Sequence, residues 1–345
     1  MRPDWKGALG LALSAALLWW TLRGEPLGPV WAAIRDANWW WWAASTTAAT
    51  LIFPLRARRW RVILEPAVGR VAGGPLWRAV AIGTMANNVL PARAGEIARA
   101  FALTREAPQV PFAAGLASLA VDRAFDGLVL LALLFAAPLD PAFPVGGRVF
   151  GQTVPMLART GMALLALLLG GMYALLAFPG GAERVFRAVA RRLVPRLEAR
   201  GADALRAFAD GLAVLRHPGR FLAVLGWTVA HWLLAAWSLW LGFRAVDLSA
   251  PFTAALFLNS VTSIATAVPA APGFFGTFEA SSKASLQLYG VPGSLALSWA
   301  LGYHVLTFIP ITVLGAVYAV RLGLGLRELS GAGVPPSPSP SQGSP

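Results

Sequence analysis

The sequence predicts an all-α, polytopic integral membrane protein: a helical bundle with about six full spans and two re-entrant broken hairpins in an inverted repeat. Of the 345 residues, 57% are hydrophobic and 13% are charged, which is about half the charged share of an ordinary soluble domain. The mean hydropathy is +0.61. Residues 1–329 are therefore expected to form one membrane domain, and the composition argues against a soluble enzyme, a disordered chain or a disulfide-stapled secreted module.

The formal net charge is +13, from 29 Lys and Arg against 16 Asp and Glu. The basic residues lie in loops beside apolar spans, as the positive-inside rule predicts, so no nucleic-acid partner is expected. The sequence has no cysteine and three scattered histidines, His217, His231 and His304. Because this set offers neither disulfides nor the usual spacing of metal ligands, no metal or cofactor is expected.

The first apolar run extends from Gly7 to Leu22 and follows Arg2 and Lys6. No small-residue cleavage site follows it, so this run is interpreted as an uncleaved helix. The second span is expected over residues 39–55 and is followed by a basic run at 56–61. This run predicts a cytoplasmic stop, which puts the N-terminus inside and the loop 24–38 outside. Tryptophans at 19–20 and 39–42 then mark one membrane interface.

Four later spans are predicted at 111–137, 155–178, 220–243 and 293–320, because each is long and apolar enough to cross the hydrocarbon layer. The stretch 180–220 carries nine arginines, with apolar residues at helical spacing. It is expected to form either two basic amphipathic helices on the cytoplasmic leaflet, broken at Pro195, or a solvated helical hairpin. The tail 330–345 is uncharged and rich in Pro and Ser, which predicts disorder.

Two regions, 75–105 and 251–290, do not have the pattern of ordinary spans. Each has an apolar half, a Pro/Gly break and an acidic residue that opens the second half; aligning Pro91 with Pro269 also aligns Gly95 with Gly273. If both regions are hairpins, they enter from opposite leaflets, both termini are cytoplasmic, and the positive-inside rule is satisfied. Charge alone does not distinguish six crossings from ten. The hairpin is favoured because the first region is too polar to face lipid.

The broken segments contain the candidate binding residues. Proline cannot donate an N–H, and irregular backbone at membrane depth is tolerated only where it is buried or lines a wet cavity. Arg93, Glu96 and Arg99 share one helical face, which indicates either a site for an anionic headgroup or a local ladder of ion pairs. The two asparagines either donate to phosphate oxygens or cap the returning helix. The full candidate set is Asn87, Asn88, Pro91, Arg93, Glu96, Arg99, Asp122, Arg123, Asp126, Pro269, Pro272, Gly273 and Glu279.

Asp122 and Asp126 are spaced four apart inside the 111–137 span, with Arg123 between them. Charges at this depth are expensive and need a partner or a cavity. An ion pair from this span to Arg93 or Arg99 and a direct role in transport are both left open. In the second broken region, Glu279 is expected either to pair with Lys283 or to couple to protons.

Three motifs together resemble the lysylphosphatidylglycerol synthase transmembrane region family. They are the run Asn87–Glu96, the pair Asp122–Arg123 with Asp126, and the segment from Pro272–Gly273 through Gly276 to Glu279. The resemblance covers roughly residues 5–325. The acid before the arginine is usually Glu in the family, whereas this sequence has Asp122.

The resemblance implies a flippase-like protein of a bacterial or archaeal cytoplasmic membrane. In fused members, a C-terminal soluble domain transfers lysine from charged tRNA to phosphatidylglycerol, and the membrane part is implicated in moving the product across the bilayer. This sequence has no such soluble segment after its last span. The resemblance therefore implies lipid handling without aminoacyl transfer.

The sequence thus predicts a non-enzymatic protein that binds and translocates a polar, anionic lipid, whose headgroup Arg93 and Arg99 would hold. Its expected partners are the lipid headgroup and the bilayer. One alternative is a non-transporting scaffold subunit for a lipid- or glycan-modifying enzyme. Another is a membrane-embedded transferase, for which only carboxylates such as Glu96 and Asp122 are at hand.

Overall fold

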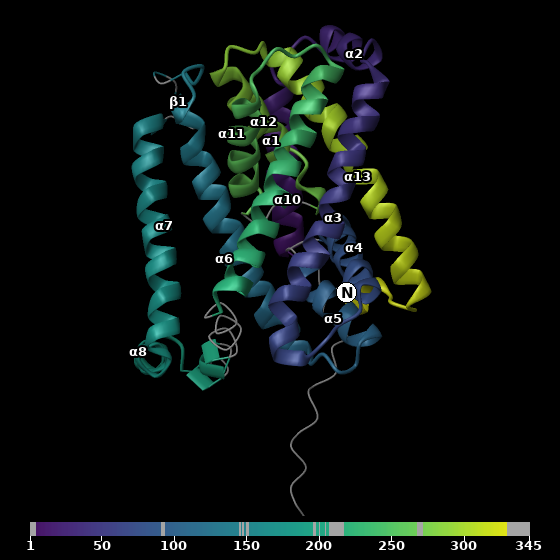
Figure 1. The fold of residues 1–345 in the computed structure, drawn as a ribbon. Coiled ribbons are helices and arrows are strands. Elements are labelled where there is room, and N and C mark those ends of the chain that lie inside the picture. Colours follow the sequence, from purple (N-terminus) through teal and green to yellow (C-terminus); the bar gives the residue numbers. More distant parts are fainter. Residues whose placement is uncertain are drawn as a thin grey trace, which may run out of the picture.

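The computed structural model describes residues 5–90, 94–144, 146, 148–149, 152–195, 198–199, 201–203, 205–206, 217–267 and 272–329. This part of the chain is almost entirely helical, as predicted, apart from the antiparallel strand pair β1 (Arg148–Val149) and β2 (Gln152–Thr153). The helices run largely along one axis (Figure 1). They are α1 (Trp5–Leu22), α2 (Leu27–Arg35), α3 (Trp39–Val68), α4 (Gly73–Val89), α5 (Gly95–Glu106), α6 (Phe112–Ala136), η1 (Ala137–Leu139), α7 (Val154–Ala177), α8 (Pro179–Leu193), α10 (Pro218–Ala245), α11 (Phe252–Ala265), η4 (Pro272–Phe274), α12 (Thr277–Leu288), α13 (Gly293–Arg321) and α14 (Leu326–Leu329).

Long helices occupy all four of the later predicted spans, and their ends agree with the predictions to within two residues. α10 has 28 residues and α13 has 29, and both are long and apolar enough to cross a membrane. At a rise of 1.5 Å per residue, each is about 42 Å long. α6 and α7, with 25 and 24 residues, approach the same length.

The N-terminal part differs from the prediction in two places. The loop 24–38 contains the short helix α2, which lies across one end of the bundle (Figure 1) and packs on α13. The second span was expected to end near Leu55, but α3 continues to Val68. Its basic run does not form a solvated stop as a whole, because Arg59 is completely buried inside the protein.

Both broken regions fold as a helix, a break and a second helix, with the two arms packed against each other. α4 packs on α5, and α11 packs on α12. The two pairs lie toward opposite ends of the bundle (Figure 1), and η4, in the second break, contacts α4 of the first pair. The breaks therefore meet in the interior. Pro91 and Arg93 lie outside the described residues, as does Pro269.

Glycine permits the close approach of α4 to α5. A Cβ atom on Gly95 would lie 2.2 Å from the Gly83 carbonyl oxygen, and one on Gly83 would lie 2.7 Å from the Gly95 carbonyl oxygen. These separations are far inside van der Waals contact, so neither position accommodates a side chain without moving a helix. In the second break, Gly273 has φ +69°, a conformation that glycine adopts at little cost.

The basic stretch 180–220 begins as a helix, as predicted. α8 ends at Leu193, two residues before Pro195. Its Glu183 forms ion pairs with Arg187 on the same helix and with Arg206 beyond the break. Most of the second predicted helix, residues 207–216, and the tail 330–345 lie outside the described residues.

Candidate functional site

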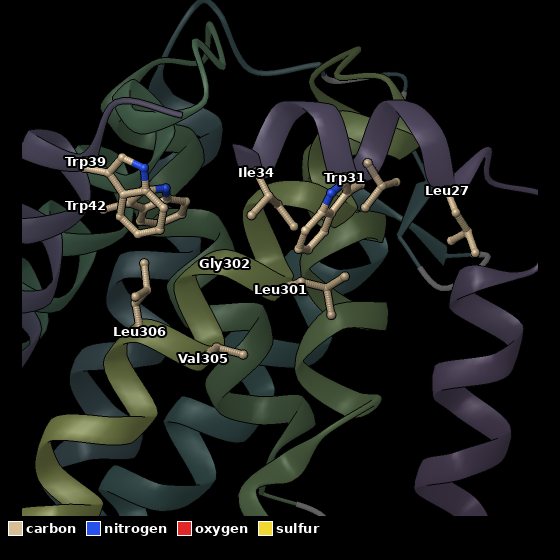
Figure 2. Close-up of a pocket in the computed structure, with 10 residues that line it drawn as sticks. Leu27, Trp31, Ile34, Trp39, Trp42, Leu301, Gly302, Val305 and Leu306 are labelled. Atoms are coloured by element: carbon tan, nitrogen blue, oxygen red, sulfur yellow. The ribbon is translucent and has the colours of Figure 1, made fainter. Parts of the chain in front are cut away.

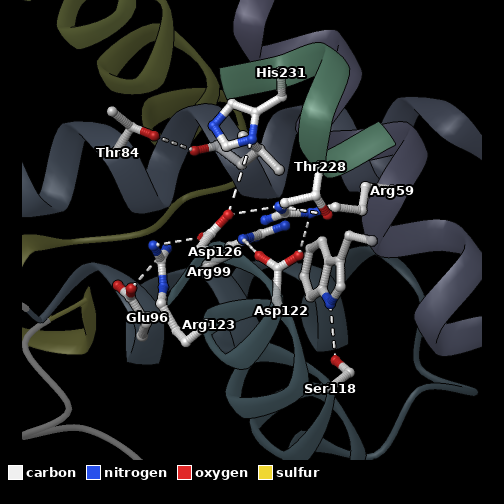
Figure 3. Close-up of polar contacts among 12 residues, drawn as sticks. Arg59, Thr84, Glu96, Arg99, Ser118, Asp122, Arg123, Asp126, Thr228 and His231 are labelled. Atoms are coloured by element: carbon white, nitrogen blue, oxygen red, sulfur yellow. Dashed lines mark hydrogen bonds and ion pairs between the residues drawn. The ribbon is translucent and has the colours of Figure 1, made fainter. Parts of the chain in front are cut away.

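The centre of the candidate site is a buried ion pair between α3 and α6 (Figure 3). Arg59 Nε lies 2.7 Å from Asp122 Oδ1, and Arg59 Nη1 lies 2.6 Å from Asp126 Oδ1. The two carboxylates reach one guanidinium because their spacing of four places them on one face of α6. Thr228 of α10 accepts a hydrogen bond of 3.2 Å from Arg59 Nη1. One arginine therefore links three helices.

α5 adds a second cation to this cluster. Arg99 Nη1 lies 3.3 Å from Asp122 Oδ2, which is one of the two pairings expected for this acid. The Arg99 guanidinium lies 3.9 Å from the centre of the Trp60 ring, and Trp60 Nε1 donates a 2.8 Å hydrogen bond to Ser118. Because Arg99 is only 3% exposed, its charge already interacts with protein groups.

A more accessible pair lies at the edge of the cluster. Arg123 Nη2 lies 2.9 Å from Glu96 Oε1, and Arg123 Nη1 lies 3.1 Å from Asp126 Oδ2. The Arg123 and Glu96 side chains are 40% and 29% exposed. Asn87 Nδ2 donates to Glu96 Oε2 over 3.3 Å, and its Oδ1 accepts the Gly95 backbone N–H at 2.8 Å. Asn87 thus caps the start of α5, one of the two roles expected for it.

The cluster contains one more positive charge than negative charges. Its four guanidinium groups (Arg56, Arg59, Arg99, Arg123) face three carboxylates (Glu96, Asp122, Asp126). The extra cation is Arg56, which forms no ion pair with the described residues and whose buried Nε has no hydrogen-bond partner among them. Arg56 is half-buried, and no described carboxylate pairs with it, so its guanidinium can take an anionic partner.

α10 covers the cluster with aromatic groups. Trp232 Nε1 donates a 3.0 Å hydrogen bond to Asp126 Oδ1, and His231 Nδ1 lies 3.9 Å from the same oxygen. His231 is buried. It belongs to this cluster, although its sequence context gave no sign of a polar partner.

The second broken region holds a separate buried pair. Glu279 is completely buried; its Oε1 lies 2.6 Å from His304 Nδ1, and its Oε2 accepts the Gly276 backbone N–H at 2.6 Å. The expected Glu279–Lys283 pair is absent, because the carboxylate turns back to the start of α12. Lys283 instead pairs with Glu25 at 2.7 Å.

A cavity of about 210 Å³ lies where the two breaks meet. α3, α4, η4 and α13 all contribute to its wall. Asn88 lines it and also donates a 2.7 Å hydrogen bond from Nδ2 to Thr312 of α13. Gly273 and His304 line it from the other broken region and its partner helix. Among the described residues, its lining contains no carboxylate; the polar members are Thr84, Asn88, Tyr303, His304 and Thr307.

A larger pocket of about 470 Å³ lies near α2 (Figure 2). Side chains of α2, of the start of α3 and of α13 surround it, among them Trp31, Trp39, Ile34 and Val305. None of its lining residues is charged. Its apolar lining, as far as the structure describes it, has the character that suits an alkyl chain.

The structure therefore brings together six of the predicted residues, Asn87, Glu96, Arg99, Asp122, Arg123 and Asp126. Asn88 and Gly273 meet at the cavity, while Pro272 lies in the second break and Glu279 in the first turn of α12. The sequence prediction missed Arg56 and Arg59. Two acids one turn apart in a span require cations from another helix, and the basic run at 56–61 could have supplied them.

Comparisons with known proteins agree with the motifs. A model of the family described as lysylphosphatidylglycerol synthase TM region matches residues 7–315. A Haloferax volcanii protein named glycosyltransferase AglD is 29% identical over 90% of this chain, although the chain spans only 53% of that relative. Two Methanothermobacter thermautotrophicus proteins, each named UPF0104 membrane protein, are 26% and 24% identical, over 90% and 79% of this chain and 91% and 81% of their own lengths. No solved structure matches.

Proposed function

Because this chain belongs to the lysylphosphatidylglycerol synthase TM region family, we propose that it is an integral membrane protein that binds a polar, anionic lipid and moves it between leaflets. The membrane would be the cytoplasmic membrane of a bacterium or archaeon. The observation that carries the proposal is Arg56, whose charge has no ion-pair partner among the described residues, near a cavity where two broken helical pairs meet.

The proposed topology has six full spans and places both termini in the cytoplasm. α4–α5 and α11–α12 would enter as re-entrant hairpins from opposite leaflets, as in transporters built from inverted repeats. Supporting this topology, the two pairs lie toward opposite ends of the bundle (Figure 1), and η4 contacts α4. The basic helix α8 lies toward the end where α4 and α5 lie (Figure 1), as the positive-inside rule requires for the cytoplasmic side.

In the proposed mechanism, a lipid phosphate enters from the end where α5 lies and meets the partly exposed Arg123. It then pairs with the half-buried Arg56, whose charge has no ion-pair partner among the described residues. Arg99 and Arg59 hold the cluster together through Asp122. The acyl chains stay in the bilayer, so only the headgroup needs a polar path. No group is assigned a catalytic role.

The test is movement of a fluorescent lipid in vesicles that contain the purified protein. Phosphatidylglycerol labelled on an acyl chain with a nitrobenzoxadiazole group is placed in both leaflets, and dithionite then bleaches the outer leaflet alone. A protein that moves the lipid lets dithionite bleach nearly all of it, whereas empty vesicles keep roughly half. Arg56→Gln should lose this activity, and Arg58→Gln, on the exposed side of the same helix, should keep it. Equal rates in empty vesicles and in those with wild-type protein would refute the proposal.

A second candidate is a non-transporting scaffold for a lipid- or glycan-modifying enzyme. It is favoured by the Haloferax relative, which is named a glycosyltransferase and is about twice as long as the matched region. Co-purification with an enzyme in fixed stoichiometry, together with no lipid movement by the pure protein, would support this alternative over transport.

A further inference from the structure

We propose that the transported headgroup is a phosphodiester with an uncharged, hydroxyl-rich substituent, and that this substituent occupies the 210 Å³ cavity while the phosphate faces Arg56. The inference rests on the proposed function and specifies its substrate class. It predicts selection against aminoacylated headgroups, which carry positive charge.

Arg56 lies on the same face of α3 as residues that line the cavity. Ala49 and Ile52 of α3 line the cavity. Arg56 follows Ile52 by four residues and Ala49 by seven, so all three lie on one face of the helix. Arg56 is thus one turn beyond the cavity wall, on the side where the ion-pair cluster lies. A ligand that spans this turn would have one part in the cavity and another at the guanidinium.

The net charge of the cluster favours an anionic headgroup. Within the described residues, the cluster has four guanidinium groups and three carboxylates, a surplus of one positive charge. A phosphodiester carries one negative charge and neutralises it. A lysyl-substituted phosphodiester carries two ammonium groups and a net positive charge, so it would add to the surplus. Juxtaposed like charges at a contact disfavour binding.

The polar groups that line the cavity are mainly hydrogen-bond acceptors. Glu279 contacts His304 Nδ1, which leaves Nε2 of this cavity-lining ring for a ligand. The hydroxyls of Thr84 and Thr307 donate to carbonyl oxygens of their own helices, so their oxygens remain available as acceptors. The ring of Phe308 offers an apolar face. A wall of acceptors suits a substituent that donates hydrogen bonds, such as a polyol, and the selection against an ammonium group rests on the surplus positive charge of the cluster.

The volume of the cavity limits the size of the substituent that it can hold. A cavity of 210 Å³ is smaller than the roughly 300–1,000 Å³ of sites that enclose a whole drug-sized ligand. This is room for one small polar substituent and not for a lipid, which agrees with a site that takes only the uncharged part of a headgroup.

The test compares four acyl-labelled lipids in the dithionite assay with the full chain in vesicles. Phosphatidylglycerol carries a linear polyol, phosphatidylinositol a cyclic polyol, and lysyl-phosphatidylglycerol a cationic substituent, while phosphatidic acid carries phosphate alone. At least one polyol lipid should move fastest, and the lysyl lipid should move about tenfold more slowly because of like-charge repulsion. The faster of the two polyol lipids shows whether the site prefers a linear or a cyclic polyol.

The double variant Thr84→Val/Thr307→Val removes two cavity hydroxyls at nearly constant volume. It should slow the preferred polyol lipid by about two- to tenfold, the range expected for lost hydrogen bonds, and leave phosphatidic acid unchanged. Thr104→Val is the matched control, since Thr104 makes the same type of intrahelical hydrogen bond and does not line the cavity.

The outcomes separate the two proposals. If no lipid moves faster than in empty vesicles, the proposed function fails. If lipids move but the lysyl lipid moves as fast as the polyol lipids, or if the cavity variant affects all four lipids equally, transport stands and this substrate class is overturned.

Discussion

A single carboxylate, Asp122, holds two buried arginines from two other helices. It contacts Arg59 at 2.7 Å and Arg99 at 3.3 Å, and all three side chains are almost inaccessible to solvent. A buried cation without its partner is much less stable than a buried pair. Loss of the Asp122 charge would leave Arg59 and Arg99 without this partner and should destabilise the fold.

We therefore expect Asp122→Asn to lower the free energy of unfolding by about 3–5 kcal/mol, the usual cost of removing one member of a buried ion pair. Thermal unfolding of the detergent-solubilised protein measures this change. Asp36→Asn is the control, because Asp36 pairs with Arg35 on the surface, where salt bridges contribute little. The melting temperature of this variant should equal the wild-type value. Equal melting temperatures for both variants would contradict the assigned role.

Residue chemistry explains which parts of the site could be predicted. Glu96, Arg99, Asp122, Arg123 and Asp126 could be singled out because charges in an apolar segment require partners. Arg56 and Arg59 could not be assigned in the same way. A basic run after an apolar span has the same pattern whether it faces water or acids, and only the packing of α3 on α6 and α10 decides between the two.

At the scale of elements, the hairpin α4–α5 depends on a contact that only glycine allows. Gly95→Ala should destabilise the protein by about 1–3 kcal/mol, as overpacking typically does, because its methyl group would meet the Gly83 carbonyl. Gly226→Ala, in the middle of α10 with open space around it, should be neutral or stabilising by up to about 1 kcal/mol through helix propensity. Thermal unfolding compares the two, and equal stability would contradict the close approach.

The attachment of α8 to the segment beyond Pro195 should depend on pH. Hydrogen bonds from Arg206 and Arg187 lower the pKa of Glu183 from 4.5 to about 2. A carboxyl with a depressed pKa stabilises the folded arrangement above its unfolded value, and this contribution is lost as pH falls from about 4.5 to about 2. The protection factors of α8 amides, which are the intrinsic exchange rates divided by the observed rates at the same pH, should therefore be high at pH 6 and lower near pH 3, and Glu183→Gln should remove this difference.

The helices themselves were largely predictable because long apolar runs bounded by Pro, Gly and charge leave few alternatives. The bounds of α6, α7, α10 and α13 agree with the expected spans. α2 was missed because nine residues in a connecting segment give too short a pattern. The contact of η4 with α4 was expected from topology, but the cavity between them depends on side-chain packing that periodicity does not describe.

At the scale of the whole molecule, the absence of cysteine makes the proposed topology directly testable. Asp36→Cys and Ala142→Cys place a single thiol at exposed positions in connections near the α2 end of the bundle, whereas Arg70→Cys and Arg321→Cys place one near the α5 end. In intact cells, an impermeant maleimide should label the first two variants, and it should label the other two only after permeabilisation. Labelling of all four in intact cells would contradict the topology.

Arg59 also constrains how the molecule can move. Its guanidinium contacts α6 at two carboxylates and α10 at Thr228, so sliding α3 past α6 would break two buried ion pairs, and sliding it past α10 would break a buried hydrogen bond. If the protein moves lipid as proposed, we expect α3, α6 and α10 to move together as one body, so that any rocking would be carried by the helices that Arg59 does not contact.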